Sequence, residues 1–384
     1  MITLQRRRWI AIFTVMILIL AGCALSPDSD KQTVKQNERK QQEKQVEHQR
    51  GEWLTLDAEH REGQWWISAR QLAKVTEGSV EVDEINGTAE LDILGVPFFL
   101  IKEVSVVERN GVYLPYELEP LFTENDVLLP LAFLENALEA EYELVETEQK
   151  VRLSLDHEAV AVFSQHGQTT FNLQELSADD LIDYLSFLSN PIPGAKISTR
   201  DSHLPGAPRS YRNGYHEGID WYGGATGIEI GLDTPVLSVA DGVVVRADHD
   251  YVEMDLEERE GYLSWSAQLS DTPNYLLDKL RGRSVWVQYD HGVMIRYAHL
   301  SAVEEGIEVG KEVKRGDVLG YVGNSGTSFA VKGDEYGGLH LHADLLIYGE
   351  LFWKYLDDLD EVRYVLEHIF QDEPKLIPDA GDYK

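Results

Sequence analysis

Short β-rich runs separated by glycine turns fill the chain from Tyr211 onward, and this pattern constrains the fold more than any other feature. Two stretches, Thr234 to Arg246 and Ser284 to Tyr297, each contain a pair of β-rich runs joined at a glycine, which is typical of a β-hairpin. Six glycines from Gly306 to Gly326 separate further short runs. The sequence therefore predicts a mainly β protein whose larger domain is an antiparallel β-sandwich or open barrel.

Residues 51–163 are predicted to form a smaller α+β domain. A short unit occurs twice there, as a strand that ends in a proline and leads into a short helix. The first copy begins with Val112 to Pro115 and the second with Val127 to Pro130. The second copy resembles the stalk-type module called the copper amine oxidase N-terminal-like domain, which implies binding to the cell wall or another surface and no copper chemistry. A generic α+β spacer is the alternative.

Three segments complete the predicted organisation of the folded part. Residues 164–208 are expected to form a helical connector, because apolar residues recur there at helical spacing before a series of prolines. Residues 209–350 form the larger β domain. Residues 351–384 contain an acidic, amphipathic helix, which is expected to pack on that domain, and a tail.

The amino terminus, residues 1–22, has the pattern of a bacterial lipoprotein signal peptide. Three arginines, Arg6 to Arg8, precede an apolar run from Trp9 to Leu20. That run is shorter than the roughly 20 apolar residues that span a bilayer. It ends in Leu-Ala-Gly before Cys23, which resembles the lipobox and implies cleavage there, a diacylglycerol on the cysteine sulfur, and a lipid-anchored protein on the outer face of the cell membrane. A buried core helix is the alternative.

The charge and the cysteine content exclude several classes of function. Lys and Arg number 34 against 67 Asp and Glu, and the formal charge of -33 repels nucleic acids at long range. Cys23 is the single cysteine, so a disulfide within the chain and a cysteine-rich zinc site are both excluded. Residues 23–50 contain no aromatic residue and many glutamines, so they are predicted to be a lipidated cysteine followed by a disordered tether.

The β-rich region also carries the residues that indicate chemistry. In chain order they are His216, Asp220, His299, His340, His342 and Asp344. Residues two apart in a strand face the same side, so His340 and His342 are expected to project together. Imidazoles and a carboxylate are good zinc ligands, and three protein ligands with an open fourth position describe a catalytic site.

These residues occur in the patterns His-x3-Asp, Tyr-Ala-His-Leu and His-Leu-His. From Tyr211 to about Gly349 the chain thereby resembles the lysostaphin/LytM-type peptidoglycan metalloendopeptidases. The resemblance implies a zinc ion bound by His216, Asp220 and His342.

The same resemblance implies that His299 and His340 stand beside the open coordination position, where either one acts as the general base. Asp344 is expected to orient a metal ligand from behind. The family usually has Phe-Glu at the positions that Ala343 and Asp344 occupy here.

Two stretches, residues 250–283 and 327–338, are longer than the family pattern and are expected to wall the groove. Their aromatic residues are expected either to contact the substrate or to pack the stretches themselves: Tyr251, Tyr262, Trp265, Tyr275, Phe329 and Tyr336. Three other histidines are expected to take no part: His203, His249 and His291.

Together these features predict a membrane-anchored zinc metalloendopeptidase that hydrolyses peptide bonds in peptidoglycan stem peptides or cross-bridges. The alternative is a catalytically silent, wall-binding scaffold of the same fold that recruits or activates another hydrolase. Degenerate scaffolds lose ligands, whereas this chain keeps all five metal and catalytic positions, which favours the enzyme. The bond that is cut and a regulatory protein partner stay open.

Overall fold

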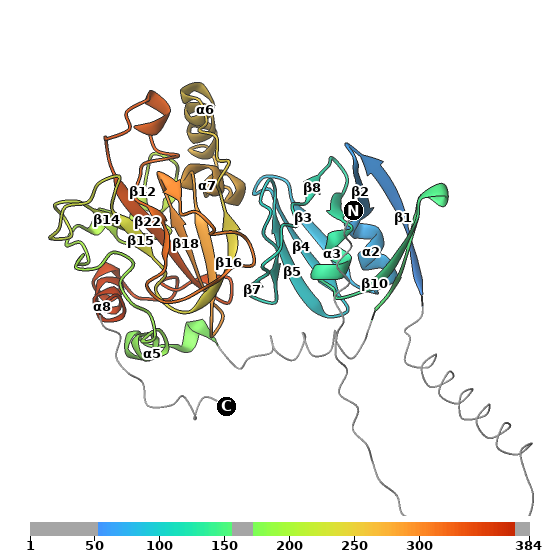
Figure 1. The fold of residues 1–384 in the computed structure, drawn as a ribbon, viewed down its shortest axis with the longest axis horizontal. Coiled ribbons are helices and arrows are strands. Elements are labelled where there is room, and N and C mark those ends of the chain that lie inside the picture. The colour runs from blue at the N-terminus through green and yellow to red at the C-terminus, as the bar shows by residue number, and fades with distance from the viewer. Residues whose placement is uncertain (1–52, 156–171, 373–384) are drawn as a thin grey trace, which may run out of the picture. The chain divides into compact units, whose positions relative to one another are not determined.

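The computed structural model describes residues 53–155 and 172–372, and every strand pairing within these ranges is antiparallel (Figure 1). The fold is mainly β, as the sequence predicts. The predicted signal peptide, Cys23 and the tether lie outside the described residues. In the part of the chain that is described, no helix is both long enough and apolar enough to cross a membrane.

The N-terminal region contains two sheets and two short helices around one hydrophobic core. The first sheet has the order β10 (Glu141–Val145), β11 (Lys150–Ser154), β1 (Leu54–Arg61), β2 (Gln64–Ser68), β9 (Val127–Pro130) and β8 (Leu121–Phe122). The second has the order β3 (Ser79–Asp83), β4 (Thr88–Ile93), β5 (Val96–Ile101), β6 (Glu108–Arg109) and β7 (Val112–Tyr113). The helices are α2 (Ala69–Val75) and α3 (Ala132–Asn136). This region thus contains both strands and short helices, and its assignment as a separate domain stays a prediction.

The two predicted strand-to-helix units have different outcomes. In the second copy, β9 ends at Pro130 and α3 follows, as expected. In the first copy, β7 ends at Tyr113 and no helix follows, so that prediction is wrong. The backbone N–H of Leu118 instead donates to the carbonyl of Ser105 at 2.7 Å, and the Leu118 side chain is fully buried. A tertiary contact therefore outweighs the local helix signal.

The larger β domain contains a seven-stranded and a three-stranded sheet that share one hydrophobic core. The large sheet has the order β14 (Ile219–Tyr222), β22 (His340–Ile347), β18 (Val293–Ala298), β17 (Val285–Tyr289), β16 (Gly242–Ala247) and β20 (Glu312–Val313), with β23 (Glu350–Leu351) paired to β22. The small sheet has the order β15 (Pro235–Leu237), β21 (Val318–Tyr321) and β19 (Ala302–Val303). A separate pair is formed by β12 (Pro208–Arg209) and β13 (Gly214–Tyr215).

One of the two predicted hairpins is correct. Strands β17 and β18 pair directly, and the turn between them has positive φ at His291 (58°) and at Gly292 (67°), as a tight hairpin turn requires. The predicted hairpin from Thr234 to Arg246 is wrong, because β15 pairs with β21 while β16 pairs with β17 and β20. The backbone of Ser238 bonds to the turn at Gly316 and Asp317, so the chain changes sheets at this point.

Four α-helices accompany these sheets in the described residues: α5 (Ala178–Tyr184), α6 (Leu256–Ser266), α7 (Asn274–Arg281) and α8 (Leu359–Ile369). Helix α5 lies in the predicted connector and begins at a capping box of Ser177 and Asp180. Helices α6 and α7 form the long stretch at residues 250–283. Helix α8 starts later than expected, because Leu351 pairs in β23 and Asp358 caps the helix. The apolar residues of α5 and α8 belong to the core of the larger domain.

The mutation Leu341→Ala is expected to lower the free energy of unfolding by about 2 to 5 kcal/mol, because it leaves a cavity in the core shared by the two sheets. Leu256→Ala removes the same atoms from a side chain that is 36% exposed, and should change this energy by less than about 0.5 kcal/mol. Urea unfolding followed by circular dichroism compares the two variants with the unmutated chain. Equal destabilisation would contradict the core assignment.

Candidate metal centre

Strand β22 positions three of the predicted site residues through its pleat. His340, His342 and Asp344 lie two residues apart and share one face, whereas the intervening Leu341 and Ala343 belong to the core. The neighbouring strand β14 pairs with β22 so that Asp220 lies directly opposite His342. The carboxylate and the imidazole therefore meet through strand register alone.

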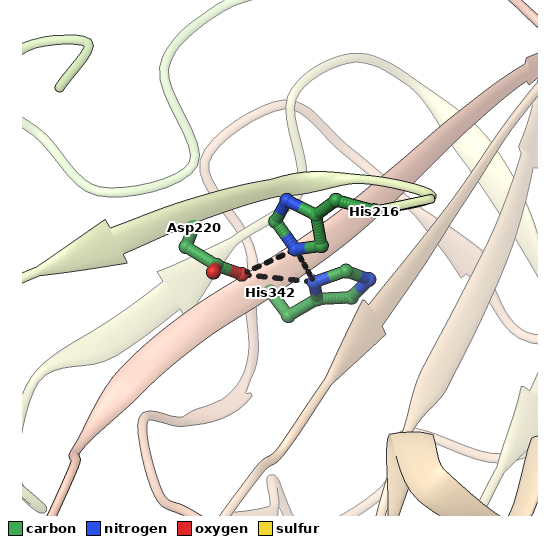
Figure 2. A group of neighbouring side chains, drawn as sticks. All are labelled: His216, Asp220 and His342. Atoms are coloured by element: carbon green, nitrogen blue, oxygen red, sulfur yellow. Dashed lines mark hydrogen bonds and ion pairs between the residues drawn. The ribbon is translucent and has the colours of Figure 1, made fainter. Parts of the chain in front are cut away.

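Three donor atoms converge at this point (Figure 2). His216 Nε2 lies 3.1 Å from Asp220 Oδ1 and 3.1 Å from His342 Nδ1, and His342 Nδ1 lies 2.9 Å from the same carboxylate oxygen. All three side chains are buried. In the described part of the chain, this is the one group of histidine, cysteine or acidic residues whose geometry suits a metal ion.

The hydrogen bond made by the outer nitrogen of each imidazole determines its tautomer, and thereby whether the inner nitrogen carries a proton. His216 Nδ1 must carry the proton, because it donates to the carbonyl of Leu204 at 2.9 Å and a carbonyl only accepts. His342 Nε2 lies 2.7 Å from Asp344 Oδ1 and donates to that carboxylate. The two inner nitrogens of the neutral rings therefore aim lone pairs at each other and at Asp220. A cation between them relieves this arrangement: without a metal, the extra proton on His342 does so, and a bound metal ion would take the place of that proton, so these residues could hold a metal ion.

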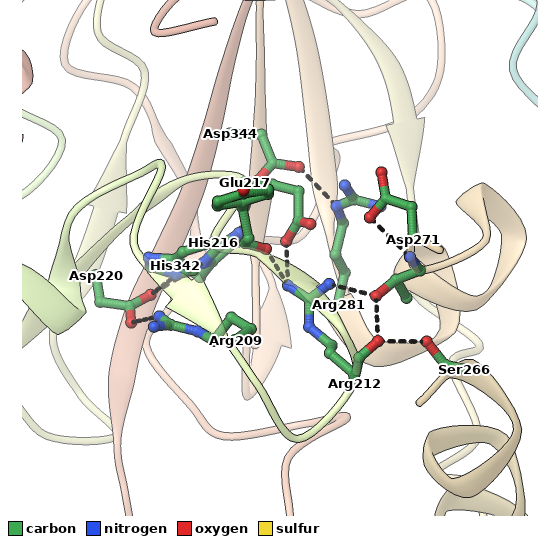
Figure 3. A network of polar contacts seen from close by, with 12 residues as sticks. Arg209, Arg212, His216, Glu217, Asp220, Ser266, Asp271, Arg281, His342 and Asp344 are labelled. Carbon is green, nitrogen blue, oxygen red and sulfur yellow. Dashed lines mark hydrogen bonds and ion pairs between the residues drawn. The ribbon is translucent and has the colours of Figure 1, made fainter. Parts of the chain in front are cut away.

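Asp344 is the fully buried anchor behind His342 (Figure 3). Its Oδ2 lies 2.7 Å from Arg281 Nε and 3.7 Å from an Arg296 nitrogen. Burial opposes ionisation, but Arg281 and His342 hold the pKa of Asp344 well below its usual range. Burial also opposes a charge on His342, but the carboxylates of Asp344 and Asp220 raise the pKa of His342 to about 9. The local field therefore favours a cation at His342.

His299 and His340 lie next to this cluster, with ring centroids 4.7 Å apart. His299 Nδ1 donates to the carbonyl of Ser325 at 2.7 Å, and His340 Nδ1 donates to that of Gly338 at 2.8 Å. Each neutral ring therefore keeps a bare Nε2 that can accept a proton. Burial lowers the pKa of His340 to about 4 and, together with the neighbouring imidazoles, holds that of His299 well below its usual range. Both rings are neutral at pH 7.

The backbone at His299 has φ of 60°, in the left-handed region that a residue with a side chain seldom adopts. The residue directly follows the last residue of β18, and its N–H donates to the carbonyl of Arg281 at 2.9 Å. Backbone strain of this kind persists where the surroundings impose it, and it clusters at functional sites. Arg281 therefore fixes His299 through its backbone and Asp344 through its side chain.

The long stretch at residues 250–283 also fixes the segment that carries His216. Arg212 lies just before His216, and its guanidinium pairs with Glu217 at 2.7 Å (Figure 3). Ser266 donates to the Arg212 carbonyl at 2.8 Å, and Thr272 accepts from the guanidinium at 2.9 Å. Helix α6 and the turn between α6 and α7 thus hold the segment that leads to His216.

The clustered residues open into a cleft of about 620 Å³. All five predicted metal and catalytic histidines and carboxylates line it, whereas Asp344 does not. His203, which was expected to take no part in the site, also lines the cleft. It packs on Tyr222, with ring centroids 4.6 Å apart. Tyr222 in turn stacks on His340 at 4.1 Å and 9°, so it holds that ring in place. His249 and His291 are not among the lining residues.

The aromatic residues of the two long stretches divide between packing and exposure. Tyr262 and Trp265 both pack on Tyr275, at 6.5 and 6.2 Å between ring centroids. Phe329 is 44% exposed and lines the cleft, and Tyr336 is 74% exposed. The packing of Tyr262, Trp265 and Tyr275 agrees with one of the two expectations, and contact of the exposed residues with the substrate stays a prediction.

Sequence reasoning missed Tyr222, Arg281, Arg212 and Arg209. Only Tyr222 had a usable signal, because it follows Asp220 by two residues and shares its face of β14. The arginines reach the site from segments whose course depends on tertiary folding.

Residues 214–352 match the model of Peptidase family M23, which confirms the predicted resemblance to the lysostaphin-type peptidases for this region. Among curated proteins, none matches the sequence.

Several solved structures are similar to this chain. The catalytic domain of lysostaphin from Staphylococcus simulans is 18% identical, over 47% of this chain and 97% of that one, with a TM-score of 0.25. A mutant catalytic domain of the prophage-encoded M23 protein EnpA from Enterococcus faecalis is 18% identical, over 43% and 92%, with a TM-score of 0.26. LytU is 22% identical, over 44% and 81%, with a TM-score of 0.24.

Asp344→Asn is expected to weaken metal binding by about 10- to 100-fold, because His342 loses the carboxylate that fixes its tautomer and orientation. Asp248→Asn is the control, since it also removes a carboxylate from a 2.7 Å ion pair, here a partly buried pair with Arg246 that does not line the cleft. Titration with metal at a temperature well below unfolding compares the variants. Similar affinities for both would show that Asp344 does not orient His342.

Proposed function

We propose that the protein is a zinc metalloendopeptidase that hydrolyses peptide bonds of peptidoglycan and is anchored to the cell membrane by a lipid on Cys23. The observation that carries the enzymatic part is the convergence of His216, Asp220 and His342 beside two proton-accepting imidazoles in one cleft. The family match of residues 214–352 supports a peptidase.

The donor set suits zinc. Two imidazole nitrogens and one carboxylate oxygen are ligands that zinc accepts, and their mutual distances of 2.9 to 3.1 Å approach the roughly 3.3 Å between ligands of a tetrahedral zinc ion. Each imidazole is also oriented by an outer partner, as metal-binding histidines usually are. A zinc ion held here would supply a Lewis acid that activates water and polarises the scissile carbonyl.

The proton transfers are assigned to His299 and His340. Their bare Nε2 atoms face the same cleft, and both rings are neutral, so one can take the proton of the attacking water. The ring that takes this proton can then give it to the leaving amine, and the other ring can stabilise negative charge on the carbonyl oxygen only in its protonated form. Backbone carbonyls fix both tautomers, so neither ring has to reorganise before it accepts a proton.

A catalytically silent scaffold is the competing function. Such a protein would bind the wall without needing intact metal ligands or a proton acceptor in the cleft. Here all five side chains are present and line one cavity, so the enzyme is the better supported proposal.

His342→Ala is expected to lose most of its zinc, because only His216 and Asp220 would remain as protein ligands. His299→Ala and His340→Ala should keep nearly stoichiometric zinc but slow the hydrolysis by roughly 10²-fold or more, the scale of losing a positioned proton-transfer group. Elemental analysis and mass spectrometry of muropeptides released from purified peptidoglycan measure both quantities on the same preparations.

His249→Ala is the matched control, because His249 bonds to the carbonyl of Ile307 and does not line the cleft. It should retain both zinc and activity. Retention of zinc by His342→Ala would remove this residue from the ligand set. An unmutated chain that binds zinc and releases no muropeptides would favour the scaffold.

The anchoring part of the proposal rests on residues 1–23, which lie outside the described residues. One thioether-linked diacylglycerol supplies two acyl chains, which is the threshold for stable membrane attachment. Cys23→Ala is therefore expected to appear in the soluble fraction or to stay unprocessed. Fractionation and intact-mass measurement test this, and a variant that is still cleaved and held in the membrane would contradict the lipoprotein assignment.

A further inference from the structure

The cleft has the opposite charge balance to the rest of the chain. The whole sequence has about twice as many acidic as basic residues, 67 against 34. The cleft is lined by four arginines and two acidic residues: Arg209, Arg212, Arg259, Arg281, Glu217 and Asp220. A concave site with an excess of one sign, and with walls of low dielectric, focuses the field on its ligand. This contrast indicates that the ligand carries negative charge.

Two of the four arginines are neutralised within the protein. Arg212 pairs with Glu217 and Arg281 pairs with Asp344, each at 2.7 Å. Arg209 lies 3.7 Å from Asp220 (Figure 3). The proposed metal ion would share the negative charge of this carboxylate, so Arg209 would be only partly neutralised.

Arg259 has no such partner. Its Nε donates to the carbonyl of Gly326 at 3.1 Å, which fixes the side chain against the cleft wall. Among the described residues, no carboxylate lies within ion-pair distance of its guanidinium, although the residue is partly buried on α6. Burial lowers the pKa of Arg259, and the more distant carboxylates of Glu253 and Glu260 offset this effect only in part. A held, partly desolvated guanidinium with no carboxylate at ion-pair distance is suited to an anion that arrives with the substrate.

We propose that Arg259, assisted by Arg209, determines specificity by binding a carboxylate of the substrate. The planar guanidinium matches a carboxylate in two parallel hydrogen bonds, which neutral amides cannot equal. The inference rests on the proposed peptidase function and names its substrate class. The preferred substrate is a peptidoglycan stem peptide with free carboxyl groups, rather than a neutral glycine cross-bridge.

Two peptides of one sequence test this inference: a stem peptide with free carboxyl groups and the same peptide with those groups amidated. The zinc-loaded, unmutated chain should have a higher kcat/KM for the free acid. Arg259→Gln should lower the ratio of acid to amide by about 10-fold or more, mainly through KM, because it removes a charge-assisted hydrogen bond. Arg259→Lys should keep part of the preference for the acid, because lysine has the positive charge but lacks the planar guanidinium that makes two parallel hydrogen bonds.

Lys311→Gln is the matched control, because it removes one positive charge from an exposed residue that does not line the cleft. It should leave the ratio unchanged. Circular dichroism and zinc content show that the variants are folded and loaded. Equal use of the two peptides by the unmutated chain, or an unchanged ratio in Arg259→Gln, would overturn the inference while leaving the peptidase intact.

Calorimetric binding of the same peptides separates the failure of this inference from failure of the proposed function. Binding that prefers the free acid and depends on Arg259, without hydrolysis, would reject the peptidase and retain the anion site. Hydrolysis of both peptides without preference would retain the peptidase and reject the anion site. If the chain neither binds nor hydrolyses the peptides, both the peptidase and the anion site are rejected.

Discussion

The site depends on the pleat and register of strand β22. The strand is paired on both sides, with β14 and β18, so its position in the sheet is fixed along most of its length. One face presents His340, His342 and Asp344, and the other supplies buried aliphatic residues to the core. A shift of one residue would bury the imidazoles among aliphatic side chains and expose the leucines. The energy that stabilises the core therefore also stabilises the geometry of the His216, Asp220 and His342 cluster.

Charges of alternating sign run through the buried part of the site. Arg281 neutralises Asp344, Asp344 supports His342, and the inner face of His342 meets Asp220. Taking single charges from water is expensive, and pairs survive burial only when geometry is close and the remaining hydrogen bonds are made. This chain of pairs permits a cation site in an interior that would otherwise reject it. It also explains why the arginines behind the site are buried as well.

The parts of the fold that sequence could predict depend on local patterns. The two-residue period placed His340 and His342 on one face, and the run from Ser284 to Tyr297 indicated a real hairpin. The stretch from Thr234 to Arg246 has an equally good turn signal, but its two strands find partners elsewhere in the chain. Local propensity does not describe that competition.

The same distinction applies to the candidate site. The grouping of His216, Asp220 and His342 came from a resemblance, because their separation along the chain says nothing of their distance in space. Arg281 reaches Asp344 only after the stretch at residues 250–283 has folded into helices. That stretch is fastened to Arg212, and through it to the segment that leads to His216. It is consequently not an interchangeable loop: grafting it onto a related domain would require Arg212 to be transferred with it.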